Sequence, residues 1–597
     1  PPRSTLFPYP TLFRSDWLML LVPPPSTHVP LYREHFRDVW KLIAERYTPS
    51  GRVLRFDLRP PLCERFYFDD FINDIRGTDN VWDYSEWARQ DFIRYLRDRR
   101  KLTLEEVSRR AGTRFESWDA VPFPRPLSGY RAQQRDTRPF WLDFMEFKHK
   151  FHPADFFLDT VRAIAAVNSD AQIFLRHYDE RYRDLLSARR IAGGYFSMEH
   201  GEPYFTLRGE SPLPRCFEWG TPAPPYPRFN AGLLHILPAL KGNALRWVYS
   251  PCLGEEKFNV PAYWKSWESL GRLSPHFAEL AEYQLPPSEV ALLGGFDVEF
   301  GKYETARPVR HPVSNDFYTS LMVRNNGGLY SVYWGAFPFN GLVPFEPLAK
   351  AADDPRIKLI LDGGNCECPP AEQQLLLRRV AEGTRAVLWS NGCRLAGTAP
   401  TGLVQKALGV EGRLAGADSG TSEIEIALPG RKPFRGNVYC VFPGIDVPGG
   451  KVVGRIGGKP AAWLIPYGKG EVLYVNGLPR TAKITDWAPF MDQVIAWAGV
   501  RPVYRATVPG REYPFLLGYA LERGDGARIF TVYNNSGEAV EGTAEYFHSL
   551  LPGRAYTFEL LHKTEAGTEL RSARQDGTTA RLVFRIQSQD MMIVKAK

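Results

Sequence analysis

Leu245-Arg-Trp-Val-Tyr-Ser-Pro-Cys-Leu-Gly-Glu-Glu-Lys-Phe258 is the stretch of sequence that decides the fold. Its first part, residues 245–249, is apolar and aromatic, and this pattern predicts a buried strand. A polar loop that carries Glu255 and Glu256 follows the strand directly. A strand that runs into a polar loop is typical of a β/α barrel, which builds its site at the carboxyl ends of its strands.

An amphipathic segment precedes this strand and predicts a helix over residues 229–240, which stops at Lys241-Gly-Asn243. The helix, the stop and the strand together resemble the last barrel repeat of the glycoside hydrolase family 42 β-galactosidases. The resemblance implies a (β/α)8-type barrel. It also implies a hydrolase that cleaves β-galactosides or related β-glycosides through a covalent glycosyl-enzyme, with retention of configuration.

Helices and strands alternate through the rest of residues 16–286, which predicts a parallel sheet with crossover helices. The expected helical segments are 31–47, 82–100 and 154–167, and the expected strands are 52–58, 172–176 and 204–207. The strands are too few for a complete barrel. We therefore expect a partial barrel that lacks roughly its first three β/α units.

The first residues do not read as part of a fold. Thr5-Leu-Phe-Pro-Tyr-Pro-Thr-Leu-Phe-Arg-Ser15 resembles the in-frame translation of a sequencing-adapter oligonucleotide, with one mismatch at Pro10. Residues 1–15 are therefore interpreted as an artefact and left out of the fold prediction. The sequence gives no basis for predicting a compartment.

Residues 288–504 alternate strands and helices in a doubly wound α/β pattern. The expected strands are 289–293, 357–361, 386–389 and 471–475, and the expected helices are 369–382 and 487–497. Gly363-Gly364 lacks the glycine spacing of a dinucleotide-binding loop, and no cofactor is predicted. The segment resembles the flavodoxin-like trimerisation domain of the same family, which implies a homotrimer formed through this domain.

Residues 512–597 predict a small C-terminal β-sandwich. Strands are expected over 515–521 and 529–533, joined by a hairpin turn at Arg523-Gly-Asp-Gly526, and then over 556–561, 581–586 and 591–594. This part resembles the C-terminal domain of the family. A structural role is favoured over sugar binding, because a fold does not specify a function.

The composition argues against several other classes of protein. The net charge of +8 is small for 597 residues, and no nucleic-acid recognition motif occurs. No apolar run is long enough to span a membrane. The seven cysteines are scattered, so no disulfide framework is predicted, and Cys366-Glu-Cys368 has no second ligand pair at zinc spacing. A carbohydrate substrate is expected, with no metal, nucleic-acid or membrane partner.

Arg208-Gly-Glu-Ser-Pro212 is the best match to the family motif at the end of barrel strand 7, with Trp219 nine residues after its glutamate. The resemblance implies that Glu210 is the catalytic nucleophile. Glu218, which directly precedes Trp219, is the alternative. Arg208 and Arg215 flank the motif, and their charge could keep a carboxylate ionised, as a nucleophile requires.

Strand 4 departs from the family pattern. Phe56-Asp-Leu-Arg-Pro-Pro-Leu62 keeps Asp57 but has Pro60 and Pro61 where the family has an Asn-Glu pair. Proline cannot transfer a proton, so the acid/base must lie elsewhere. Glu64 is the predicted acid/base, and the acidic run that contains Asp69, Asp70 and Asp74 is the other source.

The predicted substrate-binding residues are aromatic or polar and follow or lie on strands. They are Trp247, Tyr249, Trp219, Asp57 and His177, with Asp179, Glu180, Glu199 and His200 as further polar candidates. Aromatic faces suit the C–H faces of sugars. A second hypothesis is a sugar-binding or scaffold relative that has lost its strand 4 acid. A third, an amidotransferase-type enzyme built on Cys366 or Cys368, lacks the nucleophile elbow that such an enzyme needs.

Overall fold

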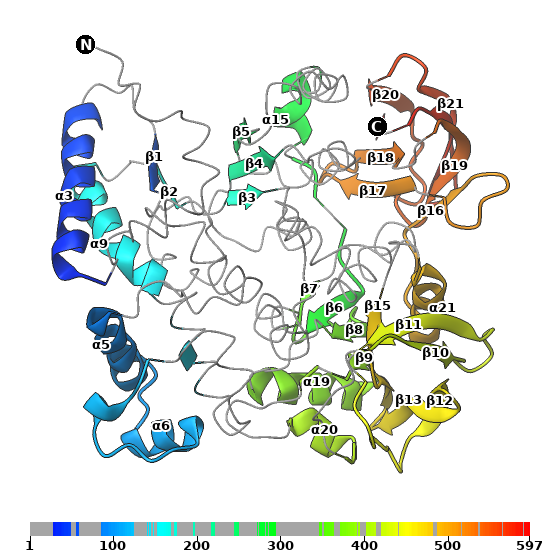
Figure 1. Cartoon of the computed structure of the whole chain (residues 1–597). Coiled ribbons are helices and arrows are strands. Elements are labelled where there is room, and N and C mark those ends of the chain that lie inside the picture. The colour runs from blue at the N-terminus through cyan, green and yellow to red at the C-terminus, as the bar shows by residue number, and fades with distance from the viewer. Residues whose placement is uncertain are drawn as a thin grey trace, which may run out of the picture. The chain divides into compact units, whose positions relative to one another are not determined.

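The structure is a computed structural model of the whole chain (Figure 1). It divides into two compact units, Pro1–Tyr195 and Phe196–Lys597. Each unit is described by itself. The structure describes residues 28–48, 55–58, 85–123, 140, 143–144, 147, 152–168, 172–175, 195–197, 216–220, 244–249, 272, 274–280, 282–284, 286–293, 346–348, 351–362, 370–390, 392–393, 402–412, 420–439, 441–480, 486–514, 516–534, 538–563, 565–588 and 590–597.

The first unit contains two successive helix–strand repeats. Helix α3 (Pro30–Tyr47) precedes β1 (Arg55–Leu58), and α9 (His152–Val167) precedes β2 (Gln172–Leu175). The two strands pair in parallel. All four elements were predicted from the sequence, and their parallel pairing confirms the β/α reading of this part.

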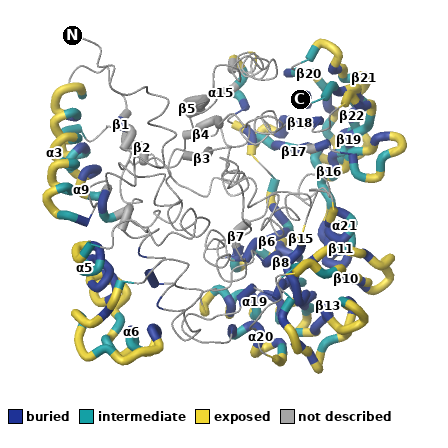
Figure 2. Tube along the Cα trace, viewed as in Figure 1, coloured by how far each residue is buried: buried dark blue, intermediate teal, exposed yellow. Residues whose placement is uncertain are grey.

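The helices of these two repeats pack side by side through aromatic rings. Phe36 of α3 lies 4.9 Å from Phe156 of α9 between ring centroids, and Tyr32 lies 6.3 Å from the same ring. Arg33 Nη2 donates to Asp155 Oδ2 at 2.8 Å beside them. The other face of α3 is exposed, with Leu42 at 63% (Figure 2). Adjacent helices over adjacent parallel strands are the arrangement of a barrel-type repeat.

A helical insertion separates β1 from α9. It contains α5 (Glu86–Arg94), a π-helical turn (Tyr95–Arg99), α6 (Leu104–Ala111) and a 3-10 turn (Trp118–Ala120). Ser85 caps α5, and α6 begins with a capping box of Thr103 and Glu106 and ends at Gly112 in the left-handed conformation. The prediction of a largely helical stretch here is confirmed for residues 86–99.

Phe92 is the centre of the insertion's core. Its ring lies 5.3–5.7 Å from the rings of Phe123, Phe140, Phe144 and Phe147. Val107 of α6 is also fully buried. The insertion therefore has an apolar core of its own, rather than being a loose loop.

The next sheet along the chain has three strands, in the order β3-β4-β5. The strands are β3 (Tyr195–Ser197), β4 (Cys216–Gly220) and β5 (Ala244–Tyr249). Strand β5 confirms the strand predicted at residues 245–249. Strands β3 and β4 were not predicted, and the strand expected at 204–207 and the helix expected at 229–240 lie outside the described residues.

A ten-stranded sheet follows, in the order β15-β11-β10-β12-β13-β14-β9-β8-β6-β7. Its parallel strands are β6 (Val290–Leu293), β7 (Glu346–Pro347), β8 (Leu359–Asp362), β9 (Arg385–Trp389) and β14 (Gly470–Val475). In chain order these five are arranged 2-1-3-4-5, which is the strand order of a flavodoxin-like fold. The α/β character predicted for this region is confirmed, and the flavodoxin-like domain stays a prediction.

The other half of this sheet is an antiparallel extension that the sequence analysis missed. It consists of β10 (Ser422–Ile426), β11 (Phe434–Tyr439), β12 (Lys451–Ile456), β13 (Lys459–Tyr467) and β15 (Leu478–Arg480). The helices of this region are α19 (Pro370–Glu382), α20 (Leu403–Ala407) and α21 (Ala488–Ala498). Helices α19 and α21 were predicted.

Two tryptophans join the sheet to α21. Trp389, at the end of β9, lies 5.6 Å from Trp487 between ring centroids, and Phe434 of β11 lies 4.9 Å from Trp487. Gly392 lets the chain pass close to the buried Asp362, because a Cβ on Gly392 would lie 1.8 Å from the carboxylate. Asp362 accepts a hydrogen bond from the Trp389 backbone N–H at 3.1 Å.

The C-terminal part is a sandwich of two four-stranded antiparallel sheets, in the orders β16-β19-β22-β21 and β17-β18-β23-β20. The first sheet contains β16 (Tyr504–Thr507), β19 (Val540–Tyr546), β21 (Glu569–Asp576) and β22 (Thr579–Ile586). The second contains β17 (Leu516–Glu522), β18 (Arg528–Asn534), β20 (Phe558–Lys563) and β23 (Met591–Ala596). The predicted sandwich and its β17–β18 hairpin are confirmed.

The chain is thus a mixed α/β protein that combines barrel-type repeats with further β-sheets. The domain boundaries predicted at 286–288 and 504–512 stay predictions. Among the helices that the structure describes, none has both the length and the apolar character needed to cross a membrane.

Candidate active site

The carboxyl ends of β1 and β2 lie at one edge of their sheet. The two strands pair in register from Arg55–Gln172 to Leu58–Leu175. Leu58 and Leu175 therefore end their strands at the same edge of the sheet. Asp57 lies on β1 opposite Phe174, one residue before this edge. This places one predicted sugar-binding residue at the position where a barrel carries its site.

Glu64 and His177, the predicted acid/base and a predicted sugar ligand, lie outside the described residues. In sequence they follow the ends of β1 and β2 by six and two residues. Pro60 and Pro61 also lie outside the described residues. Because β1 ends at Leu58, the two prolines occupy the second and third positions after the strand.

Strands β4 and β5 pair in parallel with a register shift between Phe217 and Glu218. After the shift, Glu218 is opposite Trp247, Trp219 is opposite Val248, and Gly220 is opposite Tyr249. Directly paired residues of neighbouring strands share a face of the sheet, and alternate residues along a strand share a face. Glu218, Trp247 and Tyr249 therefore belong to one face, and Trp219 belongs to the other.

This register changes how the predicted residues can act together. The backbone register gives positions 218, 247 and 249 a common face, and Glu218 is the alternative nucleophile predicted from the sequence. Glu210, the predicted nucleophile, lies outside the described residues.

Glu199, which follows strand β3, is a third candidate for the nucleophile. It ends at Ser197, and Glu199 follows two residues later in sequence, a spacing typical of a residue at the carboxyl end of a barrel strand. The sequence analysis missed both β3 and β4. The sequence features that could have predicted these strands are short: Tyr195-Phe196 after two glycines, and Cys216-Phe217 after Pro214.

The helical insertion belongs to the connection between β1 and α9, which leaves the sheet at the carboxyl edge of β1. A buried ion pair holds it together. Arg110 Nη2 lies 2.6 Å from Asp143 Oδ1, the Arg110 Nε also contacts Asp143, and Arg100 lies 3.3 Å away. The side chains of Arg110 and Asp143 are 4% and 1% exposed. This buried pair therefore links α6 to Asp143 near the end of the insertion.

Three carboxylates of the insertion, Glu86, Asp98 and Glu106, have lowered pKa values. Hydrogen bonds from Arg89 and Gln90 lower the pKa of Glu86 to about 2. The Arg97 guanidinium lowers the pKa of Asp98, and the backbone and hydroxyl of Thr103 lower that of Glu106. A glycosidase acid requires a raised pKa. These three residues can therefore be set aside as the acid that strand 4 lacks.

In the part of the chain that the structure describes, no group of three or more His, Cys, Asp or Glu side chains lies close enough together to hold a metal ion. Cys366, Cys368 and the Gly363-Gly364 pair lie outside the described residues. No observation supports a cofactor site at these positions.

No protein-family model matches the sequence, and no curated protein matches it. Solved structures are similar to nearly the whole chain. A GH42 beta-galactosidase from G. stearothermophilus is 13% identical with a TM-score of 0.64, over 96% of this chain and 82% of that one. The beta-galactosidase from Bacillus circulans sp. alkalophilus is 14% identical with a TM-score of 0.62, over 96% and 83%.

A third structure, the exo-carrageenase GH42 from Bacteroides ovatus, is 10% identical with a TM-score of 0.52, over 96% of this chain and 70% of that one. The likeness to all three covers 96% of the chain, and at this sequence identity it shows the fold alone. It shows that the chain has the fold of GH42 β-galactosidase structures.

Proposed function

We propose that this chain is a retaining glycoside hydrolase that acts on β-galactosides or related β-glycosides. The observation that carries the proposal is the end-to-end likeness to β-galactosidase structures, over 96% of the chain at a TM-score of 0.64. The placement of Asp57, Glu218, Trp247 and Tyr249 on parallel strands, near or at their carboxyl ends, supports it. These are the positions at which a barrel presents catalytic and binding groups.

The proposed mechanism needs two carboxyl groups about 5–5.5 Å apart. The nucleophile attacks the anomeric carbon while the acid donates a proton to the departing oxygen, and the acid then removes a proton from the incoming water. Glu210 is the proposed nucleophile, with Glu218 and Glu199 as alternatives. Glu64 is the proposed acid/base. Trp247 and Tyr249 would stack on the sugar, while Asp57 and His177 would accept or donate hydrogen bonds to its hydroxyls.

A second candidate function is sugar binding without efficient hydrolysis. The observation that favours it is the Pro60-Pro61 pair two residues after the end of β1, where the family carries its acid. Two prolines remove the proton donor and restrict the backbone around it. A relative that kept the nucleophile but lost the acid would hydrolyse only substrates that need no protonation.

Aryl β-galactosides separate the two candidates. With Glu64 as acid, the Glu64→Gln variant will hydrolyse a phenyl galactoside roughly 100-fold or more slowly than the unchanged chain, since general acid catalysis contributes about 10²–10⁴-fold. A dinitrophenyl galactoside will lose little in the glycosylation step, because its leaving group needs no proton. The measurement is kcat/KM for both substrates across a pH series.

Asp70→Asn is the matched control, because it removes a carboxyl from the neighbouring acidic run. Loss of phenyl galactoside turnover in Asp70→Asn but not in Glu64→Gln would transfer the acid role to Asp70. If the unchanged chain hydrolyses only the dinitrophenyl substrate, the chain is a relative that has kept the nucleophile and lost the acid. Binding of galactose without turnover of either substrate would establish a sugar-binding protein.

We further propose that the chain assembles as a homotrimer through its middle, flavodoxin-like region. The support is the resemblance of residues 288–504 to the family's trimerisation domain and the 2-1-3-4-5 order of its parallel strands. Light scattering coupled to size-exclusion chromatography measures the assembly directly. A mass of one 67.9 kDa chain at micromolar concentration would contradict the trimer.

A further inference from the structure

The helical insertion of the first unit is anchored beside the start of α3 and of α9. His28, two residues before α3, lies with its Nδ1 2.7 Å from Asp91 Oδ2 of α5, and its ring centroid is 5.8 Å from that of Phe147. Phe147 precedes α9 by five residues and packs on Phe92 of α5, with ring centroids 5.3 Å apart. Helices of a barrel run opposite to its strands, so their first residues lie level with the carboxyl ends of the strands. The insertion is therefore fixed on the side of this unit that carries the carboxyl ends of β1 and β2.

Helix α5 adds an exposed aromatic ring at this position. Trp87 precedes Asp91 by four residues, and residues with this spacing share a face of a helix. Trp87 is 53% exposed, whereas Phe92 and Tyr95 of the same helical stretch are buried. An exposed aromatic face can stack on the C–H face of a sugar. Single exposed apolar side chains are common on proteins, so the neighbours of Trp87 decide its role.

A group of cations continues the same face along the helix. Arg94, three residues after Asp91, pairs with it, and the Arg94 side chain is 60% exposed. Arg97 donates from Nε and Nη2 to Asp98 at 2.8 and 3.1 Å. The hydrogen bond from Arg97 lowers the pKa of Asp98. The charges of Lys101 and Arg94 lower this pKa further. Three cations therefore lie around one exposed carboxylate.

Positive charge exceeds negative charge in this stretch. Residues 94–101 contain five cations and one carboxylate. Among the described residues, Asp91 and Asp143 add two carboxylates that pair with cations of the stretch, so five positive charges face three negative ones. The Arg97 side chain is 49% exposed, and exposed ion pairs such as that with Asp98 contribute little to stability. The stretch can therefore bind an anion without breaking a buried contact.

The backbone that carries these cations departs from a regular helix. Tyr95–Arg99 form a π-helical turn, a feature that is frequent at functional sites. Lys101, just after the turn, has a φ of 56°, a left-handed conformation that glycine and asparagine adopt more readily than lysine. The Leu102 N–H donates to the Leu96 carbonyl at 3.1 Å and closes the turn. The cations are therefore held on a fixed backbone at the end of the helix.

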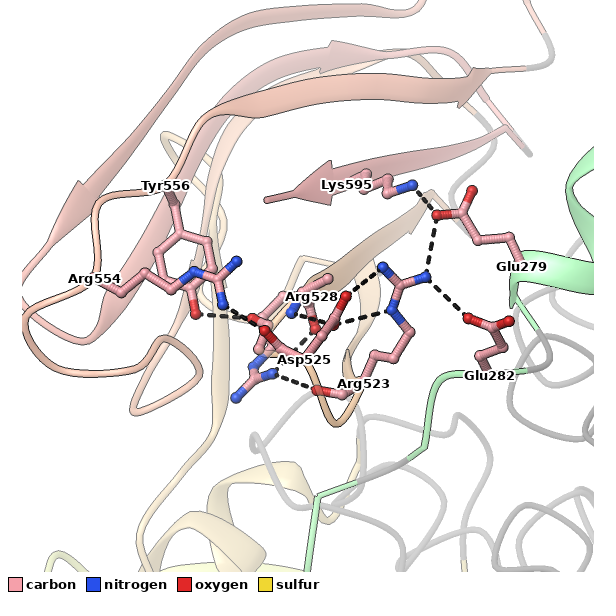
Figure 3. A network of polar contacts seen from close by, with 10 residues as sticks. Glu279, Glu282, Arg523, Asp525, Arg528, Arg554, Tyr556 and Lys595 are labelled. Atoms are coloured by element: carbon pink, nitrogen blue, oxygen red, sulfur yellow. Dashed lines mark hydrogen bonds and ion pairs between the residues drawn. The ribbon is translucent and has the colours of Figure 1, made fainter.

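A second charged network, on the C-terminal sandwich, is neutralised within itself (Figure 3). Arg523 donates to Asp525 at 3.0 and 2.6 Å and to Glu282 at 3.0 Å. Lys595, whose side chain is 8% exposed, pairs with Glu279. These two cations meet three carboxylates, and the network joins parts of the protein to one another. It therefore lacks the excess of exposed positive charge that residues 94–101 carry.

We propose that Trp87 and the cations of residues 94–101 form a binding surface for a sulfated galactan chain. A sugar ring would stack on Trp87, and sulfate groups further along the chain would pair with Arg94, Arg97 and Lys101. Positions 87 and 94 are about 10.5 Å apart along the helix, at 1.5 Å per residue, so the ligand is longer than one sugar unit. The surface rests on the proposed glycosidase function, for which it names a substrate class.

Calorimetric titration of the full chain tests the surface, with a sulfated galactan oligosaccharide and the same oligosaccharide after chemical desulfation. At low salt the sulfated form will bind about tenfold or more tightly than the desulfated form, and salt of about 0.5 M will shrink the difference, because it screens exposed charges. Arg97→Gln/Lys101→Asn will remove most of this preference, and asparagine tolerates the left-handed backbone at position 101. Lys41→Gln/Arg46→Gln is the matched control, because it removes two exposed cations from α3 of the same unit. It will leave the preference unchanged.

The aromatic part of the surface is tested by Trp87→Ala. This variant will weaken both oligosaccharides by a similar factor, about fivefold, because stacking on a sugar ring does not depend on sulfate. Trp87→Tyr keeps an aromatic face and will retain most of the affinity. A Trp87→Ala variant that binds both oligosaccharides as tightly as the unchanged chain would remove Trp87 from the surface and overturn the proposal.

Binding of an intact oligosaccharide needs no turnover, so this test separates the surface from the proposed hydrolysis. Sulfate-dependent binding by a chain that hydrolyses no aryl galactoside would support the surface and favour the sugar-binding candidate. Equal affinity for the sulfated and desulfated forms would overturn the surface, as would an equal loss of preference in Lys41→Gln/Arg46→Gln. Tighter binding of a single-stranded DNA of the same charge would show that the cations do not select a glycan.

Discussion

Replacement of the nucleophilic glutamate by glutamine will lower kcat/KM for an aryl β-galactoside on the order of 10⁴-fold, equivalent to about 5.4 kcal/mol of transition-state stabilisation. The reason is that glutamine has the shape of glutamate but cannot form a stable ester with the anomeric carbon. The prediction is made first for Glu210→Gln. If β4 is the nucleophile strand, the loss will appear in Glu218→Gln instead, because Glu218 shares a sheet face with Trp247 and Tyr249.

A 2-deoxy-2-fluorogalactoside with a dinitrophenyl leaving group identifies the residue without relying on a loss of activity. The fluorine slows hydrolysis of the glycosyl-enzyme, so the sugar stays bound to the nucleophile and can be located by peptide mass spectrometry. Attachment at Glu210, Glu218 or Glu199 assigns the role in each case. Glu569→Gln, on an exposed strand of the sandwich, is the control for unrelated effects. Absence of any adduct alongside normal turnover would exclude the covalent mechanism.

Removal of the buried guanidinium in the insertion will have the largest effect on stability. Arg110→Met leaves the carboxylate of Asp143, which is 1% exposed, without its bidentate partner. Loss of one member of a buried pair costs about 3–5 kcal/mol. We expect the lower end of that range, because Arg100 remains 3.3 Å from Asp143. The measurement is the free energy of local opening of α6, from hydrogen exchange.

The double variant Arg110→Met/Asp143→Leu is the matched control. It replaces both charges by apolar groups, and a buried pair exchanged in this way is often neutral in stability. Arg100, which is 34% exposed, can turn its guanidinium to solvent. Recovery of most of the lost stability would show that the cost comes from the stranded carboxylate. A double variant as unstable as Arg110→Met would instead mean that the shape of the salt bridge matters for packing.

The sequence predicted those elements whose local signals agree with their packing. Helix α3 begins at Pro30, which suits the first turn of a helix, and its periodic aromatic residues pack on α9. Strands β8, β9 and β14 are largely apolar runs, and they lie next to one another inside the ten-stranded sheet. Such runs are typical of buried parallel strands. In both cases one short stretch contains enough information to specify the element.

The antiparallel extension escaped prediction for a physical reason. Strand β10, Ser-Glu-Ile-Glu-Ile, buries only Ile424 and Ile426, and β11 contains Gly436 and Asn437. These strands depend on pairing with distant partners, such as the pair Ile426–Gly454, and not on local propensity. Strands β3 and β4 are also short and were not predicted. The candidate site could therefore be placed at strand ends, but the nucleophile could not be assigned to one of the glutamates that follow or lie on these strands.

Among the described residues, the ten-stranded sheet ends on its two shortest strands, β7 at one edge and β15 at the other. Each contains a proline, Pro347 and Pro479, and a proline offers no N–H to an incoming strand. Open edges of this kind are protected against runaway stacking of one chain onto the next. A trimer built through this region would therefore have to join by side-chain surfaces and not by extension of the sheet, which favours a closed assembly over a fibre.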